Sequence, residues 1–421
     1  MKGVRMKKPI VLVVVLLLFA QQAPIVKADE ISELKQQMQK MQARLEQLEA
    51  SQKAREQKVD EKISKAVESK QTMALPDSLK WAEKVKLSGD FRYRHETIEA
   101  ENDGKPDRHR NRIRARLGLK AKVNDEWSLG FRLAGGSEDP VSTNQTLSGS
   151  FSSKGFWIDR AYFDYHPTAI ENLHVVAGKM GNPFYKVGKN QLIWDGDLSP
   201  EGLAVKHKIK ITQSDELFVN GGGFFVTESS SSDSDMSLWG AQGGLKHKFD
   251  KNTYALGGIS YYDYGNIKGA EDLDVSKSNF FGNSSSGGVF VNDYDIVELF
   301  AEAGAKVSKT PVAAYGNYVK NCAADTSGDT GWLVGFKINK AKKPGSWEFS
   351  YDYRELQKDA VVGAFSDSDF IGGGTKGKGS RFGAKYQIAK NIQTGLSYFL
   401  NDRQDLDNNY RRLQVDMILK F

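Results

Sequence analysis

The sequence predicts an all-β transmembrane barrel of about 16 antiparallel strands, preceded by an α-helical coiled coil. Three observations lead to this fold class. Segments that alternate between apolar and polar residues recur from residue 85 onward, short and long connections alternate between them, and the chain begins with a targeting segment. Because successive side chains of a strand point to opposite faces, each segment has one apolar and one polar face. A membrane barrel needs both faces, one for lipid and one for a polar lumen.

Residues 1–28 are expected to be a secretory signal peptide. A basic start, an apolar run and small residues at the cleavage site follow one another: Lys2, Arg5, Lys7 and Lys8, then 10–20, then Val26 and Ala28. The apolar run is too short for a membrane-spanning helix. Cleavage would lower the formal net charge from +6 to +1, because the segment holds five Lys or Arg residues and no acid. The remaining chain lacks a global basic footprint, so we expect no nucleic-acid partner.

Residues 29–75 are expected to form a coiled coil in the periplasm. Between 29 and 70 the chain has no Gly or Pro, and apolar residues recur at spacings of three and four: Ile31, Leu34, Met38, Met41, Leu45 and Leu48. These are the a and d positions of three heptads. Polar Gln52 and Arg55 occupy the next pair, so a single solvated helix is the alternative. Pro76 ends the helical segment.

Residues 85–421 are expected to form the barrel. The alternation is clearest in VKLSGDFRYRHE, WSLGFRLAG, SWEFSYDYR and RFGAKYQI. Sixteen strand segments follow from it: 85–95, 110–123, 127–136, 156–166, 172–180, 202–211, 215–228, 236–249, 252–263, 294–307, 311–319, 331–339, 345–354, 379–389, 391–400 and 411–421. An even strand count puts both ends of the barrel segment on the same side of the membrane.

The connections between these segments alternate in length. The short ones are 124–126, 213–215, 250–251, 308–310, 341–344 and 390, and the long ones are 96–109, 137–155, 181–201, 264–293, 320–330 and 355–378. Short turns on one side and long loops on the other are typical of outer-membrane barrels. Aromatic residues such as Trp127, Trp347 and Tyr353 gather near strand ends, as in the girdles of such barrels. A large soluble β-protein, the alternative, has no reason to sort its loops by length.

The segment RHRNRIRARLGLKAKV carries a ladder of basic residues on one face. Its members share one parity: Arg108, Arg110, Arg112, Arg114, Arg116, Lys120 and Lys122. An arginine facing lipid at the membrane midplane costs about 2–4 kcal/mol, so the ladder is expected to line the lumen. Two interpretations stay open. The ladder attracts anions along the wall, or it pairs with lumen-facing carboxylates such as Asp90, Glu302 and Asp352. A wall that separates cations from anions would satisfy both.

No catalytic or metal site is expected. The six histidines are scattered along the sequence and form no grouping with a nucleophile. The Asp, Ser and Gly loops near residues 233 and 367 match no calcium-binding spacing. The single cysteine, Cys322, excludes an internal disulfide framework. We therefore expect neither an enzyme nor a cofactor.

The chain over 29–421 resembles a family of bacterial outer-membrane porins that carry a periplasmic coiled coil ahead of a large barrel. The resemblance rests on LSGDFRYRHE, IDRAYFDY, AGKMGNPF, WDGDLSPEGLAV, KPGSWEFSYDYRELQKDA, FSDSDFIGGGTKGKG and the terminal aromatic strand. It implies a passive diffusion channel that forms a homotrimer, and it supplies no particular substrate. The phosphate-selective porins are a looser relative, because they also combine coiled coils with basic lumens.

The resemblance also implies a constriction. In trimeric porins the third external loop folds into the barrel, and the third long loop here is GNPFYKVGKNQLIWDGDLSPEG. Its charged residues would then narrow the lumen: Lys186, Lys189, Asp195, Asp197 and Glu201. The alternative is a turn stabilised by Asp side chains beside a Gly.

The expected function is diffusion of small hydrophilic solutes across the outer membrane, with a preference for anions from the arginine ladder. The alternative is a structural envelope protein whose coiled coil tethers the outer membrane to peptidoglycan or to another periplasmic partner. Phe421 ends the last strand and resembles the C-terminal aromatic signal that the barrel-assembly machinery reads. Its deletion should impair insertion more than conductance.

Overall fold

The structure is a computed structural model of the whole chain. It describes residues 28–68, 77–101, 104, 106–228, 230, 235–273, 280–404 and 408–421. The chain divides into two compact units, Met1–Ser78 and Leu79–Phe421. The expected signal peptide, apart from Ala28, and the last part of the expected coiled-coil segment, 69–75, lie outside the described residues.

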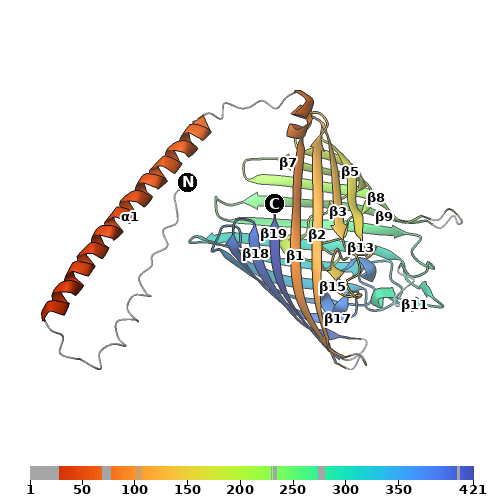
Figure 1. Cartoon of the computed structure of the whole chain (residues 1–421). Helices are drawn as coiled ribbons and strands as arrows, with labels where there is room; N and C mark the ends of the chain where they lie inside the picture. Colours follow the sequence, from red (N-terminus) through yellow and green to blue (C-terminus); the bar gives the residue numbers. More distant parts are fainter. Residues whose placement is uncertain are drawn as a thin grey trace. The chain divides into compact units, whose positions relative to one another are not determined.

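The first unit contains one long helix, α1 (Ala28–Glu68), which runs without a break (Figure 1). The absence of Gly and Pro and the many Gln, Lys, Glu and Ala residues favour this uninterrupted helix. Its seam residues Met38, Met41, Leu45 and Leu48 are 57–61% exposed. The expected helix is therefore confirmed, whereas the coiled coil stays a prediction, since it needs a second helix against this seam.

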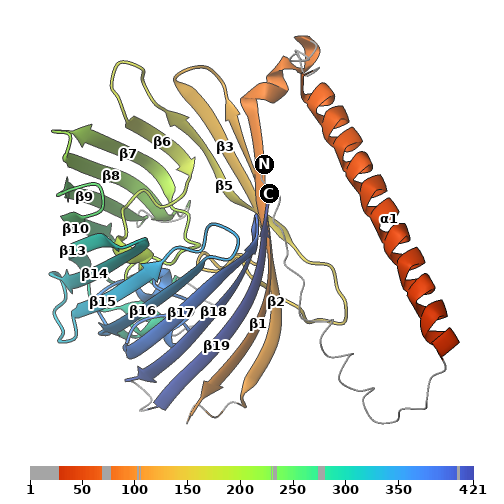
Figure 2. The ribbon, with the colours of Figure 1, turned by 90° about the vertical axis from the view of Figure 1, so that its left-hand side faces the viewer.

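The second unit is a closed antiparallel barrel of 16 strands, counted over the described residues, as the sequence predicts (Figure 2). The strands of the wall are β1 (Val85–Ala100), β2 (Arg108–Lys122), β3 (Trp127–Gly135), β5 (Phe156–Tyr165), β6 (Leu173–Lys179), β7 (Glu201–Lys210), β8 (Asp215–Thr227), β9 (Met236–Lys248), β10 (Tyr254–Gly265), β13 (Tyr294–Val307), β14 (Thr310–Asn321), β15 (Thr330–Asn339), β16 (Trp347–Leu356), β17 (Gly377–Ala389), β18 (Ile392–Arg403) and β19 (Asn408–Lys420). Each wall strand pairs with the next one along the chain, and β1 pairs with β19. Closure satisfies the backbone of every strand, which a bilayer requires.

The connections confirm the expected sorting by length. Two residues join β13 to β14 and two join β17 to β18, and in these turns Ser308 and Asn391 take the left-handed conformation that tight hairpins need. At the opposite end, which we call the outer end, most connections are longer, for example 180–200 and 357–376. Short elements lie in or beside the longer segments: η1 (Asp77–Lys84) before β1, then β4 (Gln145–Thr146), η2 (Val187–Lys189), η3 (Phe280–Gly282), β11 (Ser285–Ser286), β12 (Val289–Phe290), η4 (Gly363–Phe365) and η5 (Phe370–Gly372).

The alternation of the strands separates an apolar outer face from a polar inner face. On β1, Leu87 is 60% exposed and Tyr93 is 42% exposed, whereas Arg94 is 5% exposed and Glu96 is fully buried. Aromatic pairs mark both ends of the outer face. Trp127 lies 4.6 Å from Tyr165 near the short turns, and the rings of Trp332 and Tyr353 are 5.4 Å apart near the outer end. This arrangement fits two lipid interfaces.

Three long connections enter the barrel and form an apolar core against its inner face. The connection 180–200 contributes Val187, Leu192 and Trp194, the connection 266–293 contributes Ile267 and Phe290, and the connection 357–376 contributes Ala360, Val361 and Val362. They pack on inward-facing side chains of β10 and β13–β15: Tyr262, Tyr294, Ile296, Val319 and Leu333. The charged inner face of β1, β2 and β19 lies outside this core.

Candidate pore-lining site

Eight inward-facing arginines on three adjacent strands form what we call the arginine wall: Arg92 and Arg94 on β1, Arg108, Arg110, Arg112, Arg114 and Arg116 on β2, and Arg412 on β19. Figures 1 and 2 both show these strands side by side where the barrel closes. The register of β1 and β2 sets Arg94 opposite Arg112 and Arg92 opposite Arg114. Like charges directly opposite one another are destabilising, so this wall requires compensating anions.

Asp90 and Asp197 compensate the part of the wall farther from the outer end. The Nε atoms of Arg114 and Arg116 donate to Asp90 at 2.9 and 2.8 Å. Asp197 comes from the connection 180–200 and lies 3.9 Å from Arg114 and 3.5 Å from Arg116. The wall and the inserted loop therefore contact each other through charge.

Glu96 and Asp416 compensate the wall where the barrel closes. Glu96 is fully buried and contacts both Arg110 and Arg412, with Arg412 Nε donating at 2.7 Å. Asp416 on β19 accepts from two nitrogens of Arg94 at 2.7 and 2.8 Å. Glu96 thus links β1 to both β2 and β19. The pair of Arg94 with Asp416 bridges the closing seam between β1 and β19, and it is of the bidentate, charge-assisted kind.

Two members of the wall lack a carboxylate partner in the described part of the chain. Arg112 donates to the Oγ of Ser142 at 3.3 Å and to the backbone oxygen of Asn144 at 3.2 Å. Arg108 is exposed at the outer end of β2. Across the described residues, the eight arginines of the wall meet five carboxylates within 4.0 Å: Asp90, Glu96, Asp197, Asp369 and Asp416. Pairing is therefore extensive but incomplete, and the wall keeps a positive surplus.

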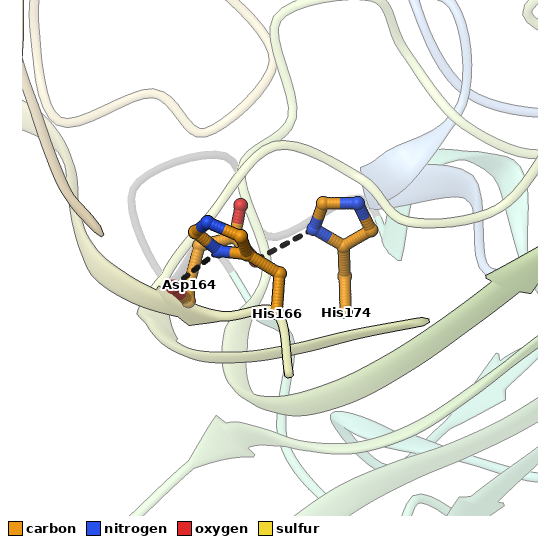
Figure 3. A group of neighbouring side chains, drawn as sticks. All are labelled: Asp164, His166 and His174. Carbon is orange, nitrogen blue, oxygen red and sulfur yellow. Dashed lines mark hydrogen bonds and ion pairs between the residues drawn. The ribbon is translucent and has the colours of Figure 1, made fainter. Parts of the chain in front are cut away.

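Lys120 lies apart from the arginine wall, near the short-turn end of β2. Its Nζ is 4.0 Å from Asp164, whose side chain also lies 2.8 Å from Nδ1 of His174. Figure 3 shows Asp164, His166 and His174 together, at the end of β5 and the start of β6. Their nitrogen and carboxylate oxygen atoms that could bind a metal ion lie within 4.8 Å of one another. Carboxylate and imidazole groups are zinc-ligand types, and the sequence analysis did not bring these three residues together. In the structure Lys120 and His174 engage the carboxylate.

The third long loop, 180–200, lies inside the barrel. It reaches the far wall, where the N–H of Gly188 donates to Glu302 at 2.7 Å, and it reaches the connection 357–376, where Ser368 N donates to Asp195 at 2.9 Å. Lys186 and Asp195 are part of this inserted segment, and the Nζ of Lys186 donates to the backbone oxygen of Asp195 at 3.2 Å. Lys189 ends η2, in the same segment. Glu201 differs, because it begins β7 at the rim and pairs with Lys179 at 2.6 Å.

The environment of this loop shifts the protonation of its charged groups. Burial, together with the nearby carboxylates Asp367 and Asp197, raises the pKa of Asp195 well above its ordinary value. Burial also lowers the pKa of Lys186, against the opposing effect of Asp195. For Asp197, burial is outweighed by Arg114 and Arg116, which hold the pKa of that carboxyl below its ordinary value. Asp197 is thus the loop's stable negative charge at the wall.

Sequence reasoning missed the part of the site that comes from the connection 357–376. Asp369 contacts Arg94 at 3.4 Å and Arg412 at 2.7 Å, and Ser368 donates its hydroxyl to the backbone oxygen of Val141 at 2.9 Å. Arg412 itself lies in a strand whose alternation was recognised, and its inward parity could have added it to the ladder. The loop residues carried no such signal, because nothing periodic connects them with β2.

A closed barrel of 16 strands with a charged inner wall and inserted loops defines a class of protein, the general outer-membrane channel. The model of the family described as "Putative porin" matches residues 97–293 and 293–421. The chain belongs to this porin family, and family and barrel together point to a channel of the outer membrane rather than an enzyme.

Solved structures of a bacterial porin are also similar to the chain. A triple mutant of the Rhodopseudomonas blastica porin shares 13% identity at a TM-score of 0.45, over 80% of this chain and 100% of that chain. A second mutant of the same porin shares 14% identity, with the same TM-score and coverage. No curated protein matches. Among the described residues, no helix is both long and apolar enough to cross a bilayer.

Proposed function

We propose that this porin conducts small hydrophilic solutes by passive diffusion and prefers anions over cations. The positive surplus of the arginine wall carries this proposal, above all Arg108 and Arg112, which lack carboxylate partners among the described residues. In a narrow polar passage with low-dielectric walls, a surplus of one charge raises the local concentration of counter-ions. The solute path would run along this wall, because its charged groups lie outside the apolar core that the inserted connections form against β10 and β13–β15.

The inserted loop 180–200 supports a constriction on this path. Asp197 contacts Arg114 and Arg116, so the loop lies directly against the wall at this height and narrows the passage there. The same contact neutralises part of the wall, which leaves the positive surplus nearer the outer end. Lys186 and Asp195 anchor the loop through buried polar contacts rather than lining the wall directly.

The test is a reversal-potential measurement in planar bilayers with a KCl gradient. The wild-type channel should show stepwise conductance with chloride preferred over potassium. Exchanging Arg108→Glu and Arg112→Glu together should lower that preference or invert it. Arg411→Glu is the control, since Arg411 has the opposite parity on β19 and is exposed, and its exchange changes the charge by the same amount as either single exchange in the wall. Absence of any conductance would refute the channel, and an unchanged reversal potential in the double variant would refute the role of the arginine wall.

The second candidate is a tether, favoured by the exposed seam of α1. Met38, Met41, Leu45 and Leu48 leave an apolar stripe uncovered, which soluble helices normally bury. Two further copies of the chain in a homotrimer, or a periplasmic partner at the peptidoglycan layer, would cover it. A variant lacking 29–75 should keep the conductance and lose trimer formation in detergent if the seam joins copies. It should instead keep the trimer and weaken the envelope if the seam binds the cell wall.

A further inference from the structure

A cleft of about 500 Å³ lies at the outer end of the arginine wall, between β1, β2, β19 and the connection 357–376. Five arginines line it: Arg108, Arg110, Arg112, Arg403 and Arg412. Asp139 and Asp369 are its carboxylates within the described residues. The lining is therefore positive before any solute enters, and it lies where a solute arriving from the outer end would first meet the wall.

The arginines of this cleft differ in how far the protein already satisfies them. Arg110 and Arg412 are held by buried Glu96, and Arg412 also contacts Asp369 at 2.7 Å. Arg112 has only neutral oxygens as partners, and its buried Nε has no hydrogen-bond partner in the described structure. A buried donor without an acceptor is destabilising. A bound anion would therefore give Arg112 the negative partner and the hydrogen-bond acceptor that it lacks among the described residues.

Arg403, across the cleft, is held in place by the chain around it. Its Nε donates to the backbone oxygen of Ile371 at 2.8 Å, and its guanidinium lies 4.7 Å from the ring centre of Tyr410. Gly372 lies beside this guanidinium, and its φ of 89° is in the left-handed region that favours glycine. A cation fixed in advance loses little entropy when a ligand binds.

Part of the remaining lining is apolar, beside the hydroxyls of Ser142, Ser366 and Ser368, and this apolar part limits the kind of anion. Ile98, Val141 and Phe281 line the same cleft as the arginines. The volume lies within the range of about 300–1,000 Å³ that is usual for sites that bind small organic molecules. An inorganic anion has no apolar surface to place against Ile98, Val141 and Phe281. A small organic body bearing separated anionic groups matches both sides.

We infer that this cleft binds small organic anions with at least two negative groups, such as polycarboxylates or phosphomonoesters. Arginine pairs bidentately with both carboxylate and phosphate oxygens, so the two chemistries share one site. The inference rests on the proposed channel, because it names the solutes that the channel concentrates at its outer end. Bound solute would lie beside the chloride path and reduce the chloride current in a saturable way.

The test uses the full-length protein in bilayers, with citrate, glucose 6-phosphate, sulfate or acetate added at constant ionic strength to one side at a time. Citrate and glucose 6-phosphate should reduce the chloride current with saturation, more strongly from the outer end, and the tighter of the two identifies the preferred group. Sulfate should need at least about tenfold higher concentration, a difference of about 1.4 kcal/mol, and acetate should have no effect. Equal effects of sulfate and citrate would reduce the site to a general attraction for charge and overturn the inference.

Variants and a second readout separate the site from the channel. Arg112→Gln and Arg108→Gln should each raise the half-blocking citrate concentration about tenfold or more. Because Arg108 is exposed, Arg108→Gln should fold even if Arg112→Gln does not. Arg411→Gln is the control and should leave the citrate block unchanged. Calorimetric titration of citrate into the detergent-solubilised protein needs no conductance. A protein that binds citrate but does not conduct refutes only the channel, whereas one that conducts but binds no citrate, or binds it equally after Arg108→Gln and Arg112→Gln, refutes the site.

Discussion

Phe421 contacts Gly89 of β1 at the short-turn end of the barrel. Their backbones exchange hydrogen bonds of 3.1 and 3.2 Å. A Cβ on Gly89 would lie 2.5 Å from the Phe421 ring and 2.6 Å from the backbone oxygen of Arg116. Gly89 therefore leaves room on the outer face of β1 for the aromatic ring.

Replacing Phe421→Ala should lower the yield of folded barrel in the outer membrane several-fold, because the aromatic ring that caps the last strand is lost. The conductance of the molecules that do insert should stay unchanged. Heat-modifiable mobility in gel electrophoresis measures the folded fraction, and Leu419→Ala, another exposed apolar residue on β19, is the control. Equal yields for both variants would show that the terminal ring has no special role in assembly.

Among single substitutions in the arginine wall and its partners, we expect replacement of the buried Glu96 to lower the stability of the fold most. It lies between Arg110 and Arg412 and also accepts from Gln414 at 2.9 Å. Glu96→Gln leaves Arg110 without a carboxylate partner and Arg412 with Asp369 alone, and it should lower the free energy of unfolding by about 3–5 kcal/mol. Urea titration of the folded barrel in lipid measures this change. Glu99→Gln on the same strand, where the side chain is exposed, should change it by far less.

At the scale of elements, the connection 180–200 should respond to pH through Asp195. The pKa of this buried carboxyl is raised above its ordinary value of 3.8, so the folded protein retains a proton that the unfolded chain loses first. The stabilisation that this bound proton contributes is fully present below pH 3.8, and it is lost as the pH rises through the pKa of Asp195 in the folded protein. Asp195→Asn removes the charge and keeps an oxygen acceptor for Ser368.

This variant should be at least as stable as the wild type at neutral pH and should lose part of the pH dependence of thermal unfolding. Melting temperatures of the detergent-solubilised protein across the acidic and neutral range test it. Glu201→Gln at the rim is the control, since its partner Lys179 lies outside the inserted segment. A wild-type and an Asp195→Asn curve that run parallel at every pH would contradict the assignment of this proton to Asp195.

The strands and the inserted loops differ in how well sequence predicts them. All 16 strand segments were predictable, because each carries a period-two pattern that is imposed by lipid on one face and water on the other. The basic ladder followed from the same parity. The contact of Ser368 with Asp195 joins residues 173 positions apart, and no local pattern encodes such a contact. The anions that neutralise the wall, Asp197 and Asp369, therefore became visible as its partners only in three dimensions.

At the scale of the whole molecule, the anion preference should depend on ionic strength. The Debye length falls from about 10 Å at 0.1 M salt to about 3 Å at 1 M, so screening reaches the dimensions of a single ion pair. The ratio of chloride to potassium permeability should accordingly fall towards that of free solution as salt increases. Reversal potentials at constant gradient and increasing mean concentration measure this ratio. A ratio independent of salt would indicate selection by contact rather than by the field of the wall.

The seam between β1 and β19 has a consequence for the order of folding. It joins Arg94 to Asp416, residues 322 positions apart, so β1 keeps an unpaired edge until the last strand arrives. The charges on the two edges also fix how they meet. In the native register Glu96 lies opposite Gln414 and Arg94 opposite Asp416, and a slip of two residues in one direction would set Glu96 against Asp416. The charges at this seam thus favour the native register, because the same ionic side chains that line the passage destabilise a barrel that closes out of register.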